Sequence, residues 1–388
     1  MSSWFHIDHS ENVLALHIDS GSVGVALMHR MKEHPSEIIY KTRVPFHSGE
    51  NPTEKSLENA MIKALSLALE NVFKNAPPLL EERGFKTKTN RAVISLSSPW
   101  VISNLKTSEL KQEKRFVLDS KIIREAILQE EEIIKQESVS KSNEENEFFE
   151  SAFVGLRVNG YQTNLPIGDK VNNAQIDFVL NISKKKLIHR IEEEITKLFP
   201  IEDGVSLQGF MFIYFKVLSH VFQTLHSSLL VNITNEATEI LFVEHNNPRL
   251  LVSLPMGPVS LARRIKDKLK IELPLAESYL KLFVRGELDS KTLLKLEPVI
   301  NSVKEEWMQA WDNKTKKFPN LAKSPYAVFL TSLPKHQDIS KMFLESVLPN
   351  KNIVVLGQDN KFTSAITKSP EGETVDENLA ITCFYDTI

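Results

Sequence analysis

The sequence predicts an α/β protein built from two similar halves, and two observations support this prediction. Residues 13–28 (VLALHIDSGSVGVALM) and 228–245 (SLLVNITNEATEILFVEH) each place a short polar turn between two apolar runs, a pattern typical of a β-hairpin. Strand-like and helix-like segments alternate along the rest of the chain, as they do in α/β folds. Because the chain has 388 residues, it is long enough for two domains with substantial cores.

The first half of the chain is expected to contain strands, helices and one loop. β-Branched residues and alternation predict strands at 13–19, 23–29, 36–46, 91–110, 151–161 and 173–182. Apolar residues at helical spacing predict helices at 55–73, 117–137, 183–199 and about 209–225. Asp119 with Ser120, and Ser183, are the expected N-terminal caps of two of these helices. Residues 138–150 are polar and acidic, which predicts a mobile loop or linker.

The second half repeats the pattern. It begins with the hairpin at 228–245, which is followed by a strand at 248–257 and by two or more helices between 259 and 316. A strand at 326–332, a helix at 336–347 and a strand at 352–357 come next. The segment ENLAITCFY, at 377–385, is expected to be a packed terminal element.

Composition excludes several classes of protein. The chain has 41% hydrophobic and 25% charged residues, as globular proteins do. Its net charge is −3, and charges of both signs are mixed along the chain, so we expect no nucleic-acid partner. The single cysteine, Cys383, fits a reducing compartment. No apolar run reaches the roughly 18 residues of a membrane span, and we expect a cytoplasmic protein without direct membrane insertion.

The turn of the first hairpin carries residues suited to a phosphate group. Backbone N–H groups of a tight turn after a strand converge on an anion, and Gly21 would allow a close approach. Ser22 adds a hydroxyl donor, and Asp19 could hold a hydrated Mg²⁺ ion. Because Asp, Gly and Ser are also ordinary turn formers, this motif by itself is more often a plain turn than a phosphate site.

The order of these pieces resembles the actin-like family that includes FtsA of bacterial cell division and PilM of type IV pilus assembly. LALHIDSGSVGVAL is similar to the first phosphate hairpin of that family, and LLVNITNEATEILFVEHNNPRLLVSLPMG lies where the second belongs. RAVISLSSPWVISNLKT and FVLDSKIIREAILQEEE match the entry into its inserted subdomain. LARRIKDKLKIELPLAESYLKLFVRG and YAVFLTSLPKHQDISKMF match its later segments, so the resemblance covers about 13–357.

The resemblance implies an actin-like (ribonuclease H-like) fold of two domains with a small inserted α+β subdomain of the SHS2 type. The first core subdomain would comprise 1–90 and 199–227, and the insert with its return helix would comprise 91–198. The second core subdomain would comprise 228–258 and 325–388, and a helical subdomain would comprise 259–324.

The resemblance also implies a nucleotide site, from which this chain departs. Its positions here are Asp19, Gly21, Ser22, Asn232, Thr234, Thr238, Glu277, Lys281, Thr331 and Ser332. In the second hairpin an amide replaces the metal-holding acid, and residues with side chains replace the glycines. Glu236 also places a carboxylate where a phosphate would lie, and the repulsion between the two costs on the order of 1 kcal/mol. Glu277 and Lys281 also fit a simple i,i+4 helix pair. We expect a degenerate ATPase without a resident cofactor, although the resemblance would allow ATP with Mg²⁺ held through Asp19.

Three functions are compatible with such a fold. They are a PilM-like scaffold that binds the cytoplasmic tail of a single-span inner-membrane protein, an FtsA-like division protein that polymerises and links a tubulin-like filament to the membrane, and a small-molecule kinase. A kinase needs both phosphate turns intact. The acidic segment after Lys368 disfavours an anchor, because membrane-surface helices need basic residues. The scaffold is therefore favoured. We expect it in the cytoplasm, held at the inner membrane by its protein partner. Contacts between copies of the chain are the other interaction that we consider.

The resemblance further implies a partner site between the first core subdomain and the insert, where a peptide docks. We expect this seam at LSSPWVISNLKT (96–107). The predicted partner-binding residues are Trp100, Val101, Ile102 and Leu105, with Trp100 as the aromatic anchor. The alternative is that Trp100 is buried under a helix of the insert.

Overall fold

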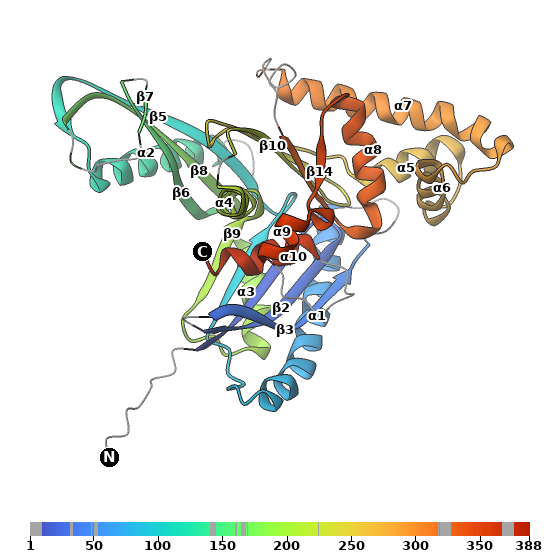
Figure 1. The fold of residues 1–388 in the computed structure, drawn as a ribbon, viewed down its shortest axis with the longest axis horizontal. Helices are drawn as coiled ribbons and strands as arrows, with labels where there is room; N and C mark the ends of the chain where they lie inside the picture. The colour runs from blue at the N-terminus through green and yellow to red at the C-terminus, as the bar shows by residue number, and fades with distance from the viewer. Residues whose placement is uncertain are drawn as a thin grey trace.

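The computed structural model of the protein describes residues 10–31, 34–47, 49, 53–139, 145–159, 161–163, 168, 170–223, 225–316, 318, 327–366 and 376–388. Within these ranges the strands form two five-stranded sheets and one four-stranded sheet. We call each five-stranded sheet with its own helices a lobe, and the four-stranded sheet with its helix the insert, because it interrupts the first lobe (Figure 1).

The first lobe contains the first predicted hairpin. Its strands are β1 (Glu11–Ile18), β2 (Ser22–Met31), β3 (His34–Pro45), β4 (Arg91–Leu96) and β9 (Val205–Gly209), in the spatial order β3-β2-β1-β4-β9. β1 pairs antiparallel with β2 and parallel with β4. Helices α1 (Glu54–Glu82) and α3 (Lys185–Leu198) bury the apolar residues of one sheet face, such as Leu14 and Leu16. A capping box between Thr53 and Ser56 starts α1.

The second lobe repeats this plan. Its strands are β10 (Ser227–Ile233), β11 (Thr238–Glu244), β12 (Asn247–Leu254), β13 (Ala327–Ser332) and β14 (Ile353–Val355), in the order β12-β11-β10-β13-β14. Its helices are α5 (Pro258–Leu269), α6 (Leu273–Arg285), α7 (Ser290–Thr315) and α8 (Gln337–Val347). Each lobe therefore has three antiparallel strands followed by parallel ones, and the predicted duplication of the hairpin is confirmed.

The insert is a curved sheet with one helix. Strands β5 (Ile102–Val117), β6 (Asn146–Val158), β7 (Tyr161–Gln162) and β8 (Lys170–Lys184) lie in the order β5-β8-β6-β7, and α2 (Ser120–Val139) packs against them. Both predicted ends of the loop at 138–150 were wrong, because helix α2 continues to Val139 and strand β6 begins at Asn146. Residues 140–144 of that prediction lie outside the described ranges.

Two further expectations need correction. The strand predicted at 91–110 is divided, because β4 ends at Leu96 and β5 begins at Ile102 in a different sheet. Ser183 does not cap α3, which has Lys184 at its N-cap, since the Ser183 hydroxyl donates instead to the Trp100 carbonyl oxygen at 2.6 Å. The Asp119 cap is confirmed by a hydrogen bond of 2.9 Å from the backbone N–H of Ile122.

A central helical layer joins the two lobes (Figure 1). It consists of α4 (Phe210–Phe222), the short α9 (Asn360–Ile366) and the C-terminal α10 (Glu377–Tyr385), and two 3₁₀ turns lie at Pro334–His336 and Leu356–Gln358. Helix α10 contacts α4, β1, β2 and β13, so the terminal segment is packed as predicted. Three acids at its ends are engaged within the protein, since Asp376 pairs with Arg43, Glu377 is buried and Asp386 pairs with Arg91.

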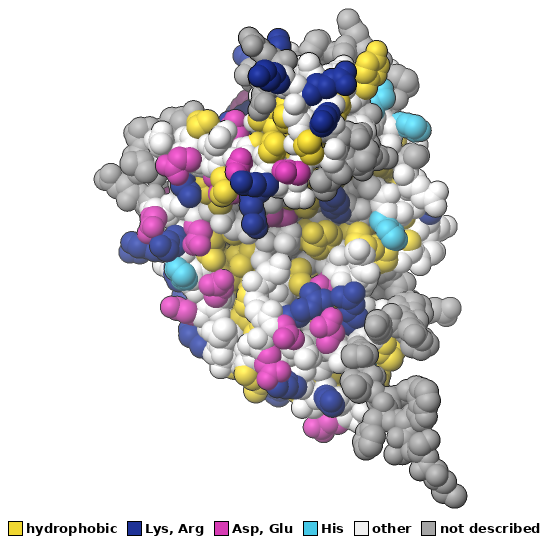
Figure 2. Space-filling model, turned by 90° about the vertical axis from the view of Figure 1, so that its left-hand side faces the viewer, with side chains coloured by type: hydrophobic (Ala, Val, Ile, Leu, Met, Phe, Trp, Pro, Cys, Tyr) yellow, Lys and Arg dark blue, Asp and Glu magenta, His cyan; other side chains and the backbone are white. Residues whose placement is uncertain are grey.

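The surface carries charges of both signs. Figure 2 shows the face of the molecule on the insert side, where Lys and Arg side chains are interspersed with Asp and Glu side chains. Among the described residues, no helix combines the length and the apolar character needed to cross a membrane.

Candidate functional site

The two hairpin turns face each other between the lobes, and they are in direct contact. The Ser20 hydroxyl lies 2.8 Å from the Thr234 hydroxyl. The backbone N–H of Glu236 donates to the Ser20 hydroxyl, also at 2.8 Å. Ser20 and Thr234 are almost fully buried. The structure therefore brings the predicted phosphate residues together, but they bind one another.

The side chain of Asn235 fills the position beside Gly21. A Cβ atom added to Gly21 would lie only 1.8 Å from Asn235 Nδ2, and Asn235 is 2% exposed. Gly21 thus permits a close approach, as predicted for a phosphate, but the group that approaches is an amide of the second turn. A phosphate does not fit between the turns in this arrangement.

Asp19, the predicted metal-holding residue, is fully buried and already has cationic and hydrogen-bonding partners. Oδ1 accepts from the backbone N–H groups of Gly21 and Ser22, at 2.7 and 2.8 Å. Oδ2 accepts from the Ser22 hydroxyl at 2.7 Å and from Arg43 Nη1 at 3.1 Å. Burial raises the pKa of Asp19, and the charge of Arg43 acts against that rise. A magnesium ion does not fit here, because the guanidinium takes its place.

The other predicted positions of the second lobe are engaged within the protein. Asn232 Nδ2 donates to Glu239 Oε2 at 2.9 Å, and the Thr238 hydroxyl donates to the Met256 carbonyl at 2.8 Å. The Thr331 hydroxyl donates to Asn378 of α10, and the hydroxyls of Ser332 and Ser340 lie 2.9 Å apart. All four predicted residues are buried, so they support the lobe and α10 in this structure.

Glu277 and Lys281 lie on α6, where they interact electrostatically with Lys335. Burial lowers the pKa of Lys335, and the nearby Lys281 lowers it further, whereas Glu277 raises it. The adjacent His336 is 4% exposed, and burial with the charges of these lysines lowers its pKa to about 3. Sequence reasoning missed Lys335 and His336, although both directly follow the strand that carries Thr331 and Ser332.

Sequence reasoning also missed Arg43, which donates to Asp19 and Ser22 of the first turn and to Asp376. Arg43 stands opposite Gly24 in the pairing of β2 with β3. A Cβ atom on Gly24 would lie 2.6 Å from Arg43 Nη2, so the glycine makes room for the guanidinium. The signal was present, because a glycine inside a strand often marks a close approach of another group.

The predicted partner anchor, Trp100, is a core residue. It is 5% exposed, it belongs to the first-lobe core, and its Nε1–H donates to the Asp19 carbonyl oxygen at 2.6 Å. Val101 is equally buried, and Leu105 is half-buried. Ile102 is 60% exposed, so it alone of the four has a freely accessible side chain. Trp100 therefore cannot anchor a peptide without leaving the core.

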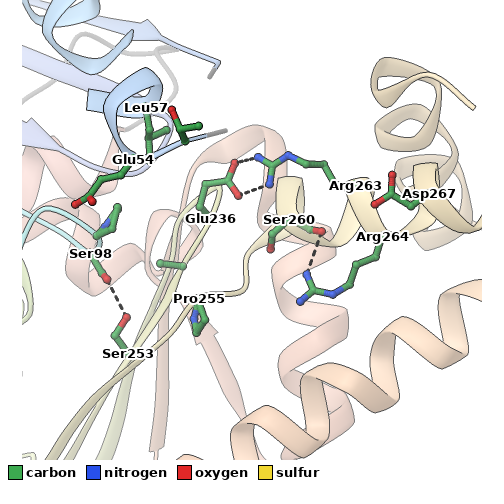
Figure 3. A pocket seen from close by; sticks show the side chains of 13 residues that line it. Glu54, Leu57, Ser98, Glu236, Ser253, Pro255, Ser260, Arg263, Arg264 and Asp267 are labelled. Carbon is green, nitrogen blue, oxygen red and sulfur yellow. Dashed lines mark hydrogen bonds and ion pairs between the residues drawn. The ribbon is translucent and has the colours of Figure 1, made fainter. Parts of the chain in front are cut away.

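A pocket of about 580 Å³ does open beside the predicted seam, between the two lobes (Figure 3). Ser98 and Pro99, at the entry to the insert, form one wall, and the start of α1 with Glu54 and Leu57 forms another. The opposite wall comes from the second lobe and includes Glu236, Pro255, Ser260, Arg263, Arg264 and Asp267. Its lining combines apolar and charged groups.

Two interactions shape this pocket. Arg263 holds the carboxylate of Glu236 with both ends of its guanidinium, so the charge at the second turn is neutralised from α5 (Figure 3). The hydroxyls of Ser98 and Ser253, which both line the pocket, lie 2.9 Å apart and join the two lobes there. Among the described residues, no group of three or more His, Cys, Asp and Glu side chains could hold a metal ion, in the pocket or elsewhere.

Comparison with known proteins shows the fold. The sequence matches no protein-family model and no curated protein sequence. The structure is similar to that of the PilM-PilN type IV pilus biogenesis complex, with a TM-score of 0.60 and 14% identity over 97% of this chain and 98% of the other. A diol dehydratase-reactivating factor in nucleotide-free form gives 0.49 at 10% identity (97% and 99% covered), and the ethanolamine utilization protein EutJ from Carboxydothermus hydrogenoformans gives 0.45 at 10% (97% and 89%).

Proposed function

The chain has the actin-like fold of PilM, and on this premise we propose that it is a non-catalytic scaffold of a type IV pilus or secretion platform. It lies in the cytoplasm, at the inner membrane, and binds the cytoplasmic tail of a single-span membrane protein. The likeness to PilM extends over both lobes and the insert, since 97% of this chain is covered. That extent supports the same arrangement of lobes and insert as in PilM, which is the basis of the proposal.

The direct contact between the two turns is the observation that carries the non-catalytic part of the proposal. Asn235 fills the phosphate position, and Arg43 fills the metal position beside Asp19. ATP turnover needs a phosphate held by both turns. The same contact disfavours the FtsA-like and kinase alternatives, because both rely on a nucleotide between the lobes.

The pocket beside the insert is the proposed partner site. It lies between the two lobes, beside the seam that was predicted for a peptide, and Ser98 and Pro99 line it in place of Trp100. Leu57 and Pro255 provide apolar walls, and the carboxylate of Asp267 stands among the lining residues, whereas that of Glu54 pairs with Lys184. An extended tail with an apolar side chain next to a basic one fits this chemistry.

Binding of a synthetic tail peptide tests the proposal. The peptide is taken from the cytoplasmic end of a single-span membrane protein encoded beside this gene, and its binding is followed by fluorescence anisotropy. Leu57→Glu places a charge in the pocket and should weaken binding by about tenfold or more. Leu67→Glu is the matched control, because Leu67 lies on the same helix but is 48% exposed outside the pocket.

ATP with Mg²⁺ should leave the affinity unchanged in this assay. Equal binding by the two variants would place the partner elsewhere on the surface. A requirement for ATP, or sustained phosphate release by the wild-type protein, would contradict the non-catalytic role.

A further inference from the structure

Arg43 uses its whole donor set in the closed site. A guanidinium group has five N–H donors. Nε and Nη2 donate to the two oxygens of Asp376, and Nη2 also faces His17 Nδ1 at 3.3 Å. Nη1 donates to Asp19 at 3.1 Å and to the Ser22 hydroxyl at 2.7 Å. Five donors thus meet five contacts, in a site where only 17% of the arginine side chain is exposed.

The surroundings are built to receive a positive charge. Two carboxylates, Asp19 and Asp376, approach the guanidinium from two sides. Burial keeps the pKa of His17 well below its usual value, so its imidazole is neutral, accepts from Arg43 and adds no competing charge. Gly24 has no side chain where the guanidinium lies. A cation stabilises this pair, because Asp19 is fully buried, the Asp376 side chain is only 18% exposed, and two such carboxylates repel each other.

Asp376 connects this cation to the second lobe. The residue also caps α10, since its Oδ1 accepts from the backbone N–H of Leu379 at 3.1 Å. In the first turn of that helix, Asn378 accepts from Thr331 of β13, and one turn later the Thr382 hydroxyl lies 2.7 Å from that of Ser95 of β4. Helix α10 thus crosses from one sheet to the other, and Arg43 holds its N-cap residue, Asp376.

We propose that Arg43 is a built-in cation, which takes the position of a bound metal ion beside Asp19 and fastens α10 across the two lobes. The lobes then stay closed without a nucleotide. This inference rests on the proposed function, because it explains how a scaffold of this fold keeps its shape when nothing binds between the turns.

Removal of the guanidinium tests the inference. Arg43→Ala leaves the two carboxylates facing each other, and the melting temperature should fall by about 5 °C or more. Guanidinium chloride, far below the concentration that unfolds proteins, or Mg²⁺ should recover at least half of that loss. The same additions should leave the wild-type protein unchanged. Hydrogen exchange at the backbone amides of 378–385 should become faster in the variant, and it should slow again when the cation is added.

Two further variants make the result specific. Arg83→Ala is the matched control, because Arg83 pairs with Glu37 at an exposed position of the same lobe, and neither cation should affect it. Arg43→Lys keeps the charge but has three donors, so its loss should be smaller and its exchange in α10 intermediate. This variant serves if Arg43→Ala does not fold.

Two results would overturn the inference. One is a loss in Arg43→Ala that no cation recovers, and the other is wild-type exchange in α10 for the Arg43 variants. Both measurements are made without the tail peptide, so they stand apart from a failure of the peptide-binding assay.

Discussion

Replacement of Trp100 distinguishes a core residue from a partner anchor. The indole is 5% exposed and packs with Phe46, whose ring centroid lies 6.5 Å away. Truncation of a buried tryptophan to alanine costs roughly 3–5 kcal/mol. Trp100→Ala also removes the hydrogen bond to the Asp19 carbonyl, and a buried carbonyl left unpaired adds about 1–3 kcal/mol. The combined cost, roughly 4–8 kcal/mol, should lower the melting temperature by about 10 °C or more.

The assay has two measurements. Circular dichroism gives the melting temperature of each variant, and fluorescence anisotropy gives its affinity for the tail peptide. Trp100→Phe retains a ring but loses the N–H donor, so its cost should fall between wild type and alanine. Ile102→Ala is the matched control, because Ile102 is 60% exposed and its truncation should leave stability nearly unchanged. The reasoning would be refuted by a Trp100→Ala variant that melts within about 2 °C of wild type and has lost the tail peptide.

Two other predictions concern buried groups. Burial raises the pKa of Glu377 from 4.5 to about 8, so the folded state keeps a proton that the unfolded state releases, and stability should fall as the pH rises from about 4.5 to 8. Glu377→Gln should remove that part of the pH dependence, and at pH 9 the variant should be more stable than wild type by up to roughly 5 kcal/mol. If the melting temperatures of the two proteins had the same dependence on pH, this prediction would be wrong. Gly24→Ala should destabilise the protein by about 1–3 kcal/mol, because the new Cβ meets the Arg43 guanidinium. In a double-mutant cycle its cost should shrink in the Arg43→Ala background, and full additivity would show that the two sites are independent.

The sequence by itself determined the elements and their duplication. Strand and helix periodicities are local, so they placed both hairpins and the start of α1 close to their observed positions, although α1 continues to Glu82, beyond the predicted end at residue 73. The segment 377–385 was expected only as a packed element, and it is the helix α10. The order of the motifs also indicated the actin-like fold, which the likeness to PilM confirms. Local patterns were weaker between elements, where the chain leaves one sheet for another. They missed the break after Leu96 and extended the polar loop into α2 and β6.

Only the tertiary structure decided what the candidate site contains. The turn from Asp19 to Ser22 has the residues of a phosphate turn, and nothing within it reveals that Asn235 occupies the space. Arg43 and Asp376 are 333 positions apart in the chain, so no local pattern joins them. Trp100 follows the end of a strand, where alternation no longer tells which way a side chain points. The physical reason is the same in each case, because packing between distant segments sets these contacts, and periodicity along one segment carries no information about them.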